Sequence, residues 1–389
     1  MSRRAKWEYL HAIHQRYRQA SPTEKSRILD ECCQVCGYHR KSALRLLNGP
    51  LPLQRPRRRP RRATRYSPEA LTILVAVWEA ASYPWSVRLK ALLPLWLPWI
   101  RQHFALTPAL ERQVLAISAR QLDRRLQTRR RHLKRRLYGR TKPGTLLKHH
   151  IPIKTDHWDV TQPGWTEIDL VSHSGACAAG EFAHSLTLTD IHTTWTESRA
   201  VLGKGETGIV AAIEEMRQGL PFVLQGLDSD NGSEFLNDHL VQYARSHQLQ
   251  FTRGRPYKKD DNAHIEQKNW THVRKLLAWE RYDTGQALAA INTLYRQDLR
   301  LMMNLFQPSV KLVKKVRVGS RLTRVYDTAQ TPLDRVAACP DADRVKVAAL
   351  QRVRERTDPF VLAQRIDAQL AKLFRLATTR QPTKMTHVR

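Results

Sequence analysis

The stretch Trp165-Thr-Glu-Ile-Asp-Leu-Val171 sets two acidic residues inside a run of aromatic and aliphatic ones. Such a run predicts a β-strand, and Glu167 and Asp169 would share one face of it because side chains alternate along a strand. A carboxylate in the middle of a strand is costly to bury unless it is paired or binds a metal ion. The stretch therefore predicts both a sheet and a site on that sheet.

A second acidic stretch, Leu224-Gln-Gly-Leu-Asp-Ser-Asp-Asn-Gly-Ser-Glu-Phe235, follows further along the chain. Its Asn231-Gly232 pair signals a turn, so we expect Asp230 at the carboxyl end of a strand, where open α/β sheets gather their ligand sites. A third acid, Glu266, falls in the first turn of a helix that we predict over residues 263–279.

Together, Trp165-Thr-Glu-Ile-Asp169, Ser229-Asp-Asn-Gly-Ser-Glu-Phe235 and Asn262-Ala-His-Ile-Glu-Gln-Lys-Asn269 resemble the catalytic core shared by retroviral integrases and many bacterial insertion-sequence transposases. The resemblance covers about residues 160–300. It implies a ribonuclease H-like fold and a catalytic, metal-binding triad of Asp169, Asp230 and Glu266. In this chain 35 residues separate the last two, a common spacing in that family. We interpret the neighbouring Glu167 and Asp228 as supporting or surface acids.

The triad also agrees with the chemistry that such a core would perform. Three carboxylates this close would repel one another without metal, and hard oxygen ligands suit Mg²⁺ (or Mn²⁺), with two ions in each site. The resemblance implies that water attacks a phosphodiester at the end of the element and frees a 3′-OH, which then attacks target DNA. Since two DNA ends must be joined, we expect a homodimer or a larger assembly.

The net charge of the chain also indicates DNA as the partner. The chain carries 66 Lys and Arg against 35 Asp and Glu, and residues 1–150 hold 33 of the basic residues but only 8 of the acidic ones. An excess of this size favours a polyanion. We therefore expect double-stranded DNA, both terminal inverted repeats and target, to be bound largely by the first 150 residues.

The pattern of elements predicts a multidomain chain: all-α helix-turn-helix units at the N-terminus, a central α/β ribonuclease H-like core with a mixed sheet, and a small C-terminal β unit with a helix. The predicted parts are a helix-turn-helix (1–49), a basic Pro/Arg linker (50–66), a second helical DNA-binding domain (67–138), a hinge (139–157), the integrase-like core (158–300) and the C-terminal part (301–389).

The predicted DNA contacts are basic or amide side chains on three kinds of segment. A basic helix at 39–47, expected to bury Ala43, Leu46 and Leu47, presents its cations outward, and the Pro/Arg linker suits a narrow minor groove as well as loose phosphate contact. The residues are Arg40, Lys41, Arg45, Arg57, Arg58, Arg59, Arg61, Arg62, Arg120, Arg124, Arg125, Lys258, Lys259, Lys268 and Asn269.

Near the C-terminus, residues 316–318 and 322–326 predict short strands, and Asp358-Pro359 opens an amphipathic helix. The apolar stripe of that helix, from Leu362 to Ala377, could join two subunits or pack within the chain. Five cysteines in an odd, clustered set predict a reducing compartment. Cys33, Cys36 and His39 have a spacing that could bind zinc, but we interpret the two cysteines as small buried thiols. No stretch is long and apolar enough to span a bilayer, so we expect a cytoplasmic, nucleoid-associated bacterial protein.

Two other functions stay open at this point. One is a transposase-derived DNA-binding regulator with an inactive core, against which the complete triad argues. The other is a ribonuclease H-type nuclease, which would hydrolyse without joining and would not need the upstream DNA-binding units. The product formed from labelled duplex ends distinguishes all three.

Overall fold

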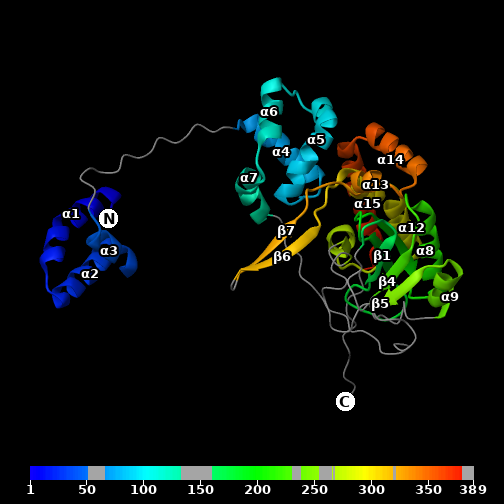
Figure 1. Cartoon of the computed structure of the whole chain (residues 1–389), viewed down its shortest axis with the longest axis horizontal. Helices are drawn as coiled ribbons and strands as arrows, with labels where there is room; N and C mark the ends of the chain where they lie inside the picture. Colours follow the sequence, from blue (N-terminus) through cyan, green and yellow to red (C-terminus); the bar gives the residue numbers. More distant parts are fainter. Residues whose placement is uncertain are drawn as a thin grey trace, which may run out of the picture. The chain divides into compact units, whose positions relative to one another are not determined.

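The computed structural model describes residues 1–50, 66–132, 160–229, 238–253, 265, 268–318 and 321–378. The chain divides into two compact units, Met1–Thr64 and Arg65–Arg389 (Figure 1). Each unit has its own hydrophobic core.

The first unit is a three-helix bundle whose helix ends follow from the sequence. The helices are α1 (Arg3–Gln19), α2 (Pro22–Cys36) and α3 (Arg40–Asn48). Ser21 and Glu24 form a reciprocal capping box before α2, and Gly37 ends that helix in the left-handed region with φ 63°. The ring of His39 accepts the Lys41 backbone N–H and so caps α3.

The core of this unit corrects the prediction that Leu46 is buried and shows where two of the clustered cysteines lie. Ala43 and Leu47 are buried, but Leu46 is 38% exposed because it lies on the outer side of the short helix α3. Cys32 and Cys36 are both buried in the hydrophobic core, and burial raises the pKa of Cys32 to about 12. With His39 serving as a helix cap, these thiols pack as small apolar side chains.

The next four helices belong to the second unit. They are α4 (Pro68–Ala80), α5 (Ser86–His103), α6 (Pro108–Ala116) and α7 (Ala119–His132). The side chains of Ser67 and Thr107 cap α4 and α6, each before a proline at the first helical position. Their core continues into the rest of the unit: the Trp96 indole N–H donates to the Phe306 carbonyl at 3.3 Å. These helices therefore share one core with the sheet, and the predicted hinge lies outside the described residues.

A five-stranded mixed sheet forms the centre of the second unit. Its strands are β1 (Trp165–Ser172), β2 (Ala183–Asp190), β3 (Thr196–Leu202), β4 (Gly226–Ser229) and β5 (Gln250–Arg253), in the order β3-β2-β1-β4-β5. The first three strands are antiparallel neighbours, while β4 and β5 run parallel to β1. This mixed sheet fits the predicted ribonuclease H-like core, with the acidic strand β1 at its middle.

Helices and helical turns surround the sheet. They are α8 (Glu206–Gly219), α9 (Asp238–Ser246), the π-helix η1 (Asn269–Arg274), α11 (Lys275–Leu277), α12 (Gly285–Leu294) and the π-helices η2 (Tyr295–Leu299) and η3 (Met302–Phe306). The amides of Asn292 and Asn304 bond both backbone groups of Ala200 and Thr196, and so cover the outer edge of β3. Bonds at these two positions disfavour the pairing of β3 with a foreign strand.

The C-terminal part consists of a two-stranded hairpin and three helices. They are β6 (Leu312–Val318), β7 (Arg321–Tyr326), α13 (Pro332–Ala338), α14 (Arg344–Arg356) and α15 (Pro359–Leu376). In α15, Leu362, Ile366 and Leu373 are buried within the chain. Of the two alternatives considered for the apolar stripe, the structure therefore shows packing within the chain. No helix in the described part of the chain is long and apolar enough to cross a membrane.

Candidate active site around Asp169

Asp169 lies in the middle of β1 with a half-buried side chain. One carboxylate oxygen, Oδ1, accepts the Leu170 backbone N–H at 2.7 Å. The other, Oδ2, accepts a hydrogen bond from Asn269 Nδ2 at 2.6 Å. Asn269 is the first residue of η1, so the start of this π-helix is fixed against the centre of the sheet.

Glu167 and Asp228 lie on adjacent strands at the same level of the sheet, because β1 and β4 pair Glu167 with Asp228. Glu167 is 1% exposed and accepts the backbone N–H of Ile265 at 3.0 Å. Asp228 is fully buried and accepts the Thr252 hydroxyl of β5 at 2.7 Å. The surface role considered for these two acids was wrong, since both are buried and support neighbouring elements.

Sequence reasoning missed the partners of these acids for a physical reason. Ile265 and Asn269 are about a hundred residues from the strand that they contact, and Thr252 carries no motif. Strand periodicity predicts which side chains share a face, but not which element covers that face. No local signal could have found these three contacts.

Lys268, which was predicted as a DNA contact, is buried in the structure. Its side chain is 9% exposed, and Nζ donates to the Thr194 carbonyl at 3.2 Å. Burial, together with the positive charges of Arg88 and Arg335, lowers the pKa of Lys268 to about 7. A basic residue beside a motif is thus an interior group here.

Arg274, at the end of η1, contributes positive charge to this region. Its guanidinium lies over the Trp279 ring, 3.9 Å from the centroid. Burial lowers the pKa of Arg274 to about 10, while the charges of Tyr295 and Asp169 act in the opposite direction. The arginine therefore stays protonated at neutral pH and partly offsets the charge of Asp169.

The oxygen atoms near Asp169 fit a hard divalent cation. Among the described residues, Asn269 Oδ1 and Ser229 Oγ are buried without a hydrogen-bond partner. Ser229 ends β4 and immediately precedes Asp230, which, like Glu266, lies outside the described residues. Within the described ranges, no three acidic, His or Cys side chains converge on one point. Oxygen donors of this kind suit Mg²⁺ or Mn²⁺ better than softer metals.

The predicted DNA contacts occupy varied environments. On α3, Lys41 and Arg45 are exposed, while Arg40 is exposed but pairs with Asp30. On α7, Arg120 and Arg124 are exposed and Arg125 is half-buried. The other predicted contacts lie outside the described residues: Arg57, Arg58, Arg59, Arg61, Arg62, Lys258 and Lys259. Their role in binding DNA stays a prediction.

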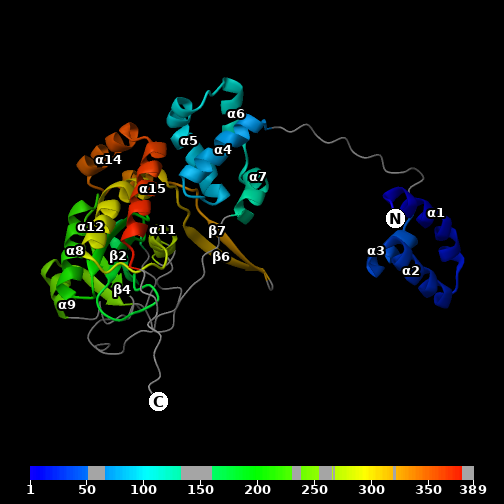
Figure 2. The same ribbon diagram turned by 180° about the vertical axis from the view of Figure 1, so that it is seen from behind.

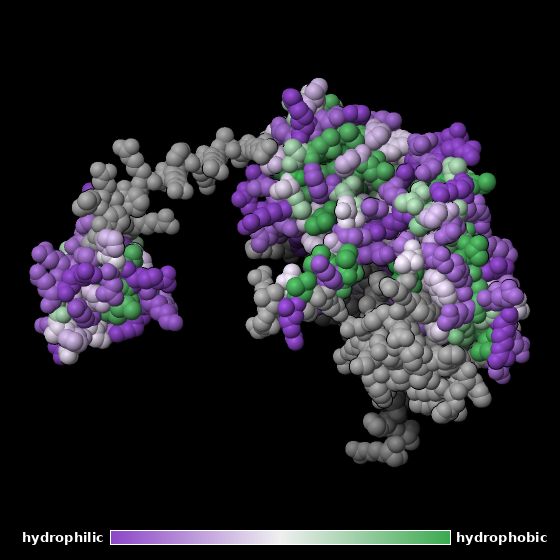
Figure 3. Space-filling view, viewed as in Figure 1, coloured by the Kyte–Doolittle hydropathy of each residue, from purple (hydrophilic) through white to green (hydrophobic). Residues whose placement is uncertain are grey.

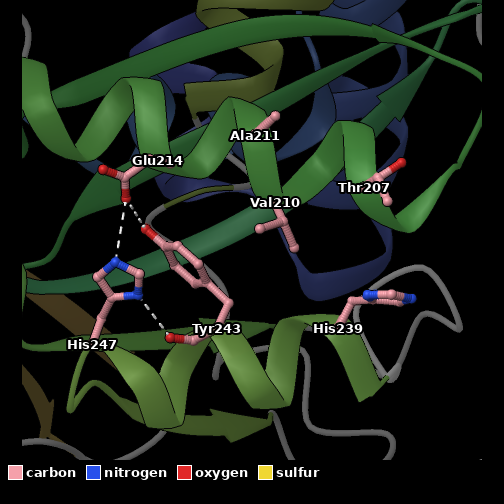
Figure 4. Close-up of a pocket in the computed structure, with 7 residues that line it drawn as sticks. All are labelled: Thr207, Val210, Ala211, Glu214, His239, Tyr243 and His247. Atoms are coloured by element: carbon pink, nitrogen blue, oxygen red, sulfur yellow. Dashed lines mark hydrogen bonds and ion pairs between the residues drawn. The ribbon is translucent and has the colours of Figure 1, made fainter.

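A pocket of about 440 Å³ opens between α8 and α9 (Figure 4). Its lining comprises Thr207, Val210, Ala211, Glu214, His239, Tyr243 and His247. The Tyr243 hydroxyl donates to Glu214 at 2.7 Å, and hydrogen bonds from Arg217 and Tyr243 lower the pKa of Glu214 to about 2. The pocket shares no residue with the group around Asp169, so we treat it as a feature of helix packing.

Comparison with known proteins gives one relative of substantial similarity. Protein y4rM of Sinorhizobium fredii (strain NBRC 101917 / NGR234), described as uncharacterized, is 40% identical over 336 residues, which cover 86% of this chain and 95% of y4rM. No family model matches the chain.

The solved structures that are similar to part of this chain include two integrase catalytic core domains. The catalytic core domain of BIV integrase has a TM-score of 0.29 and 13% identity, covering 44% of this chain and 91% of that domain. The HTLV-2 integrase catalytic core domain, solved in complex with magnesium in a dimeric form, has a TM-score of 0.29 and 12% identity, covering 38% and 92%.

Proposed function

The chain belongs to the family of protein y4rM of Sinorhizobium fredii. We propose that it is a DNA transposase. The relative is uncharacterized, so the proposal rests on the residues of this chain. It would cleave DNA at the ends of an insertion sequence and join the freed 3′-OH to target DNA. We expect it to act as a homodimer or larger assembly on the bacterial nucleoid in the cytoplasm.

The observation that carries the proposal is the hydrogen bond from Asn269 to Asp169. It joins the middle of β1 to the segment whose sequence contains Glu266, three residues before Asn269. A second contact, from the Ile265 N–H to Glu167, joins the same two segments one residue before Glu266. Both contacts support a catalytic triad of Asp169, Asp230 and Glu266, as does the 35-residue spacing between the last two.

The three carboxylates would hold Mg²⁺ or Mn²⁺. When bound, a pair of such ions neutralises charge on the phosphate and stabilises the attacking and leaving oxygens of an in-line displacement. Asn269 would keep Asp169 in one orientation through its hydrogen bond, which is how outer groups commonly position metal ligands. Arg274 would limit repulsion among the acids by its nearby positive charge.

The proposed reaction has two displacements at phosphorus. In the first, a water oxygen forms a P–O bond, the bond to the 3′ oxygen of the element breaks, and that oxygen leaves as a 3′-OH after gaining a proton. In the second, this 3′-OH forms a P–O bond with a target phosphate and displaces a target 3′ oxygen. No covalent intermediate with the enzyme is required.

The test uses the purified full chain, Mg²⁺ and labelled duplexes taken from the DNA that flanks its gene. The proposal predicts joined products with the wild-type chain, none with Asp230→Asn, and normal joining with Asp341→Asn. Asp341 is an exposed acid and provides a matched control. Hydrolysis without joining would indicate a nuclease instead. Equal lack of reaction in wild type and Asp230→Asn, with DNA bound, would indicate a regulator.

A further inference from the structure

The hairpin formed by β6 and β7 is a separate two-stranded sheet. Within the described residues, neither strand pairs with the five-stranded sheet, and Figures 1 and 2 show the hairpin extending away from it. An isolated two-stranded ribbon is marginally stable in water at best. It therefore needs support at its base or a partner along its length.

The base of the hairpin is firmly attached to the body of the second unit. Asp327 and Lys311 exchange hydrogen bonds, with the Asp327 N–H donating to the Lys311 carbonyl at 3.0 Å and the Lys311 N–H donating to Asp327 Oδ1 at 2.6 Å. Arg335 of α13 bonds the other oxygen of Asp327 at 2.6 Å. Lys311 Nζ also donates to the His192 carbonyl at 2.7 Å. The ribbon thus projects from a fixed base.

Beyond the base, the ribbon carries only one sign of charge. The sequence from Leu312 to Tyr326 contains five basic residues and no acidic one. Lys314, Arg317 and Arg324 are exposed. A surface that carries one sign of charge favours a polyanionic partner.

Apolar side chains are exposed along the same ribbon. Val313 is 61% and Val316 37% exposed, and in Figure 3 hydrophobic and hydrophilic residues are mixed in this part of the surface. At the base, Tyr326 (43% exposed) meets Trp85 (47% exposed) edge to face, with ring centroids 6.3 Å apart. A partner for this ribbon must therefore offer phosphates together with apolar groups.

We infer that the β6–β7 ribbon binds in the major groove of duplex DNA. The major groove of B-DNA admits a two-stranded β-ribbon and presents phosphates at its rims and thymine methyl groups on its floor. The deep, narrow major groove of duplex RNA does not admit side chains in this way. The inference rests on the proposed function and adds a DNA-binding element beyond the catalytic group.

The first experiment measures affinity for labelled duplex DNA as a function of salt. It compares the full-length wild type with Lys314→Ala/Arg317→Ala/Arg324→Ala and with a control, Arg352→Ala/Arg356→Ala/Lys372→Ala, which removes three exposed cations from α14 and α15. If each ribbon cation contacts one phosphate, the slope of log K against log salt becomes shallower by roughly 2.7 in the ribbon variant. The control keeps the wild-type slope.

Thermal melting by circular dichroism confirms that both triple variants are folded, and a Lys314→Gln/Arg317→Gln/Arg324→Gln variant replaces the alanine variant if that one melts early. A wild-type slope and affinity in a folded ribbon variant would refute the inference while leaving end joining, and hence the proposed function, intact. Failure of the wild-type chain to bind duplex DNA would refute both.

A second experiment identifies the groove. Dimethyl sulfate methylates guanine N7, which faces the major groove. The wild type should protect a set of guanines that the ribbon variant leaves reactive at protein concentrations giving equal occupancy. Identical protection by the two proteins, or equal competition by duplex RNA of the same sequence, would overturn major-groove binding by the ribbon.

Discussion

At the scale of single residues, Asp169 is held from two directions, by its own strand at Leu170 and by η1 at Asn269. A catalytic carboxylate with two fixed oxygens keeps one orientation without help from substrate. The amide of Asn269 also has its second polar atom, Oδ1, buried without a partner among the described residues. Asn269 therefore uses one amide atom to hold Asp169, and we interpret it as a positioning residue.

Asn269→Ala should therefore lower the rate of end joining by about 10- to 100-fold, the usual effect of losing a group that orients a metal ligand. The Mg²⁺ concentration for half-maximal rate should rise with it, a change that a structural role alone would not produce. Thr293→Ala on α12 is the control, because its exposed hydroxyl donates to the Ala289 carbonyl of its own helix. An unchanged Mg²⁺ requirement would contradict the positioning role.

The sequence predicted Asp169 correctly as a member of a β-strand, but it left open whether Glu167 and Asp228 are supporting or surface acids. A strand pattern cannot distinguish a face covered by a neighbouring helix from one open to water. The same limit applies to Lys268, whose charge suggested a surface although its ammonium bonds the interior carbonyl of Thr194. The roles of Asp230 and Glu266 stay predictions, carried by motif and spacing.

At the scale of elements, α8 and α9 are joined by the Tyr243 hydroxyl and the Glu214 carboxylate. The pKa of Glu214 falls from its ordinary 4.5 to about 2, mainly through its hydrogen bond with Arg217. A carboxyl group whose pKa is lower in the folded state than in the unfolded state stabilises the fold at pH values above the unfolded-state pKa. That stabilisation is lost as the pH falls through the folded-state pKa. The contribution of Glu214 is thus complete above about pH 4.5 and vanishes near pH 2.

Melting temperatures of wild type and Glu214→Gln test this sign. The wild type should melt higher at pH 6, and the gap should shrink progressively as the pH falls below 4.5. Glu355→Gln on α14 alters an exposed acid and should show little gap at any of these pH values. A gap for Glu214→Gln that grows on acidification would mean that the pKa is raised instead.

Most strands and helices of the core followed from sequence, and the exceptions have local causes. The strand expected before Asp230 is short: β4 comprises Gly226–Ser229 and pairs with β1 and β5 along four residues. The helix predicted over 263–279 is described as π-helical η1 followed by α11, and it ends at Ala278, whose φ is 56°. Hydrophobic periodicity is similar for α- and π-turns over so short a length, so the sequence did not distinguish them.

At the scale of the whole molecule, helices α4 to α7 share a core with the sheet, although the sequence predicted a separate domain there. Trp96 is fully buried, bonds the Phe306 carbonyl, and meets Phe360 of α15 edge to face at 5.2 Å. The pattern of elements suggested a boundary there, with a hinge at 139–157. Packing between distant segments crosses that boundary, and no local pattern records it.

Trp96→Ala should cost about 3–5 kcal/mol of unfolding free energy, as expected for removing a buried aromatic side chain. Because the core is continuous, amide hydrogen exchange should accelerate both in α4–α7 and in β1–β5. Trp85→Ala, which removes an exposed indole, should change exchange little. Acceleration confined to α4–α7 would show that these helices unfold as a domain of their own.

The central claim is that Asp169 is a catalytic carboxylate for DNA end joining. The most direct measurement is the single-turnover rate of joining by Asp169→Asn at saturating Mg²⁺, with Asp341→Asn as control and DNA affinity measured alongside. The account predicts a loss of at least about a thousandfold in rate, the scale of removing a catalytic group, with DNA affinity retained and the control unaffected. Joining by Asp169→Asn at the wild-type rate would contradict the account.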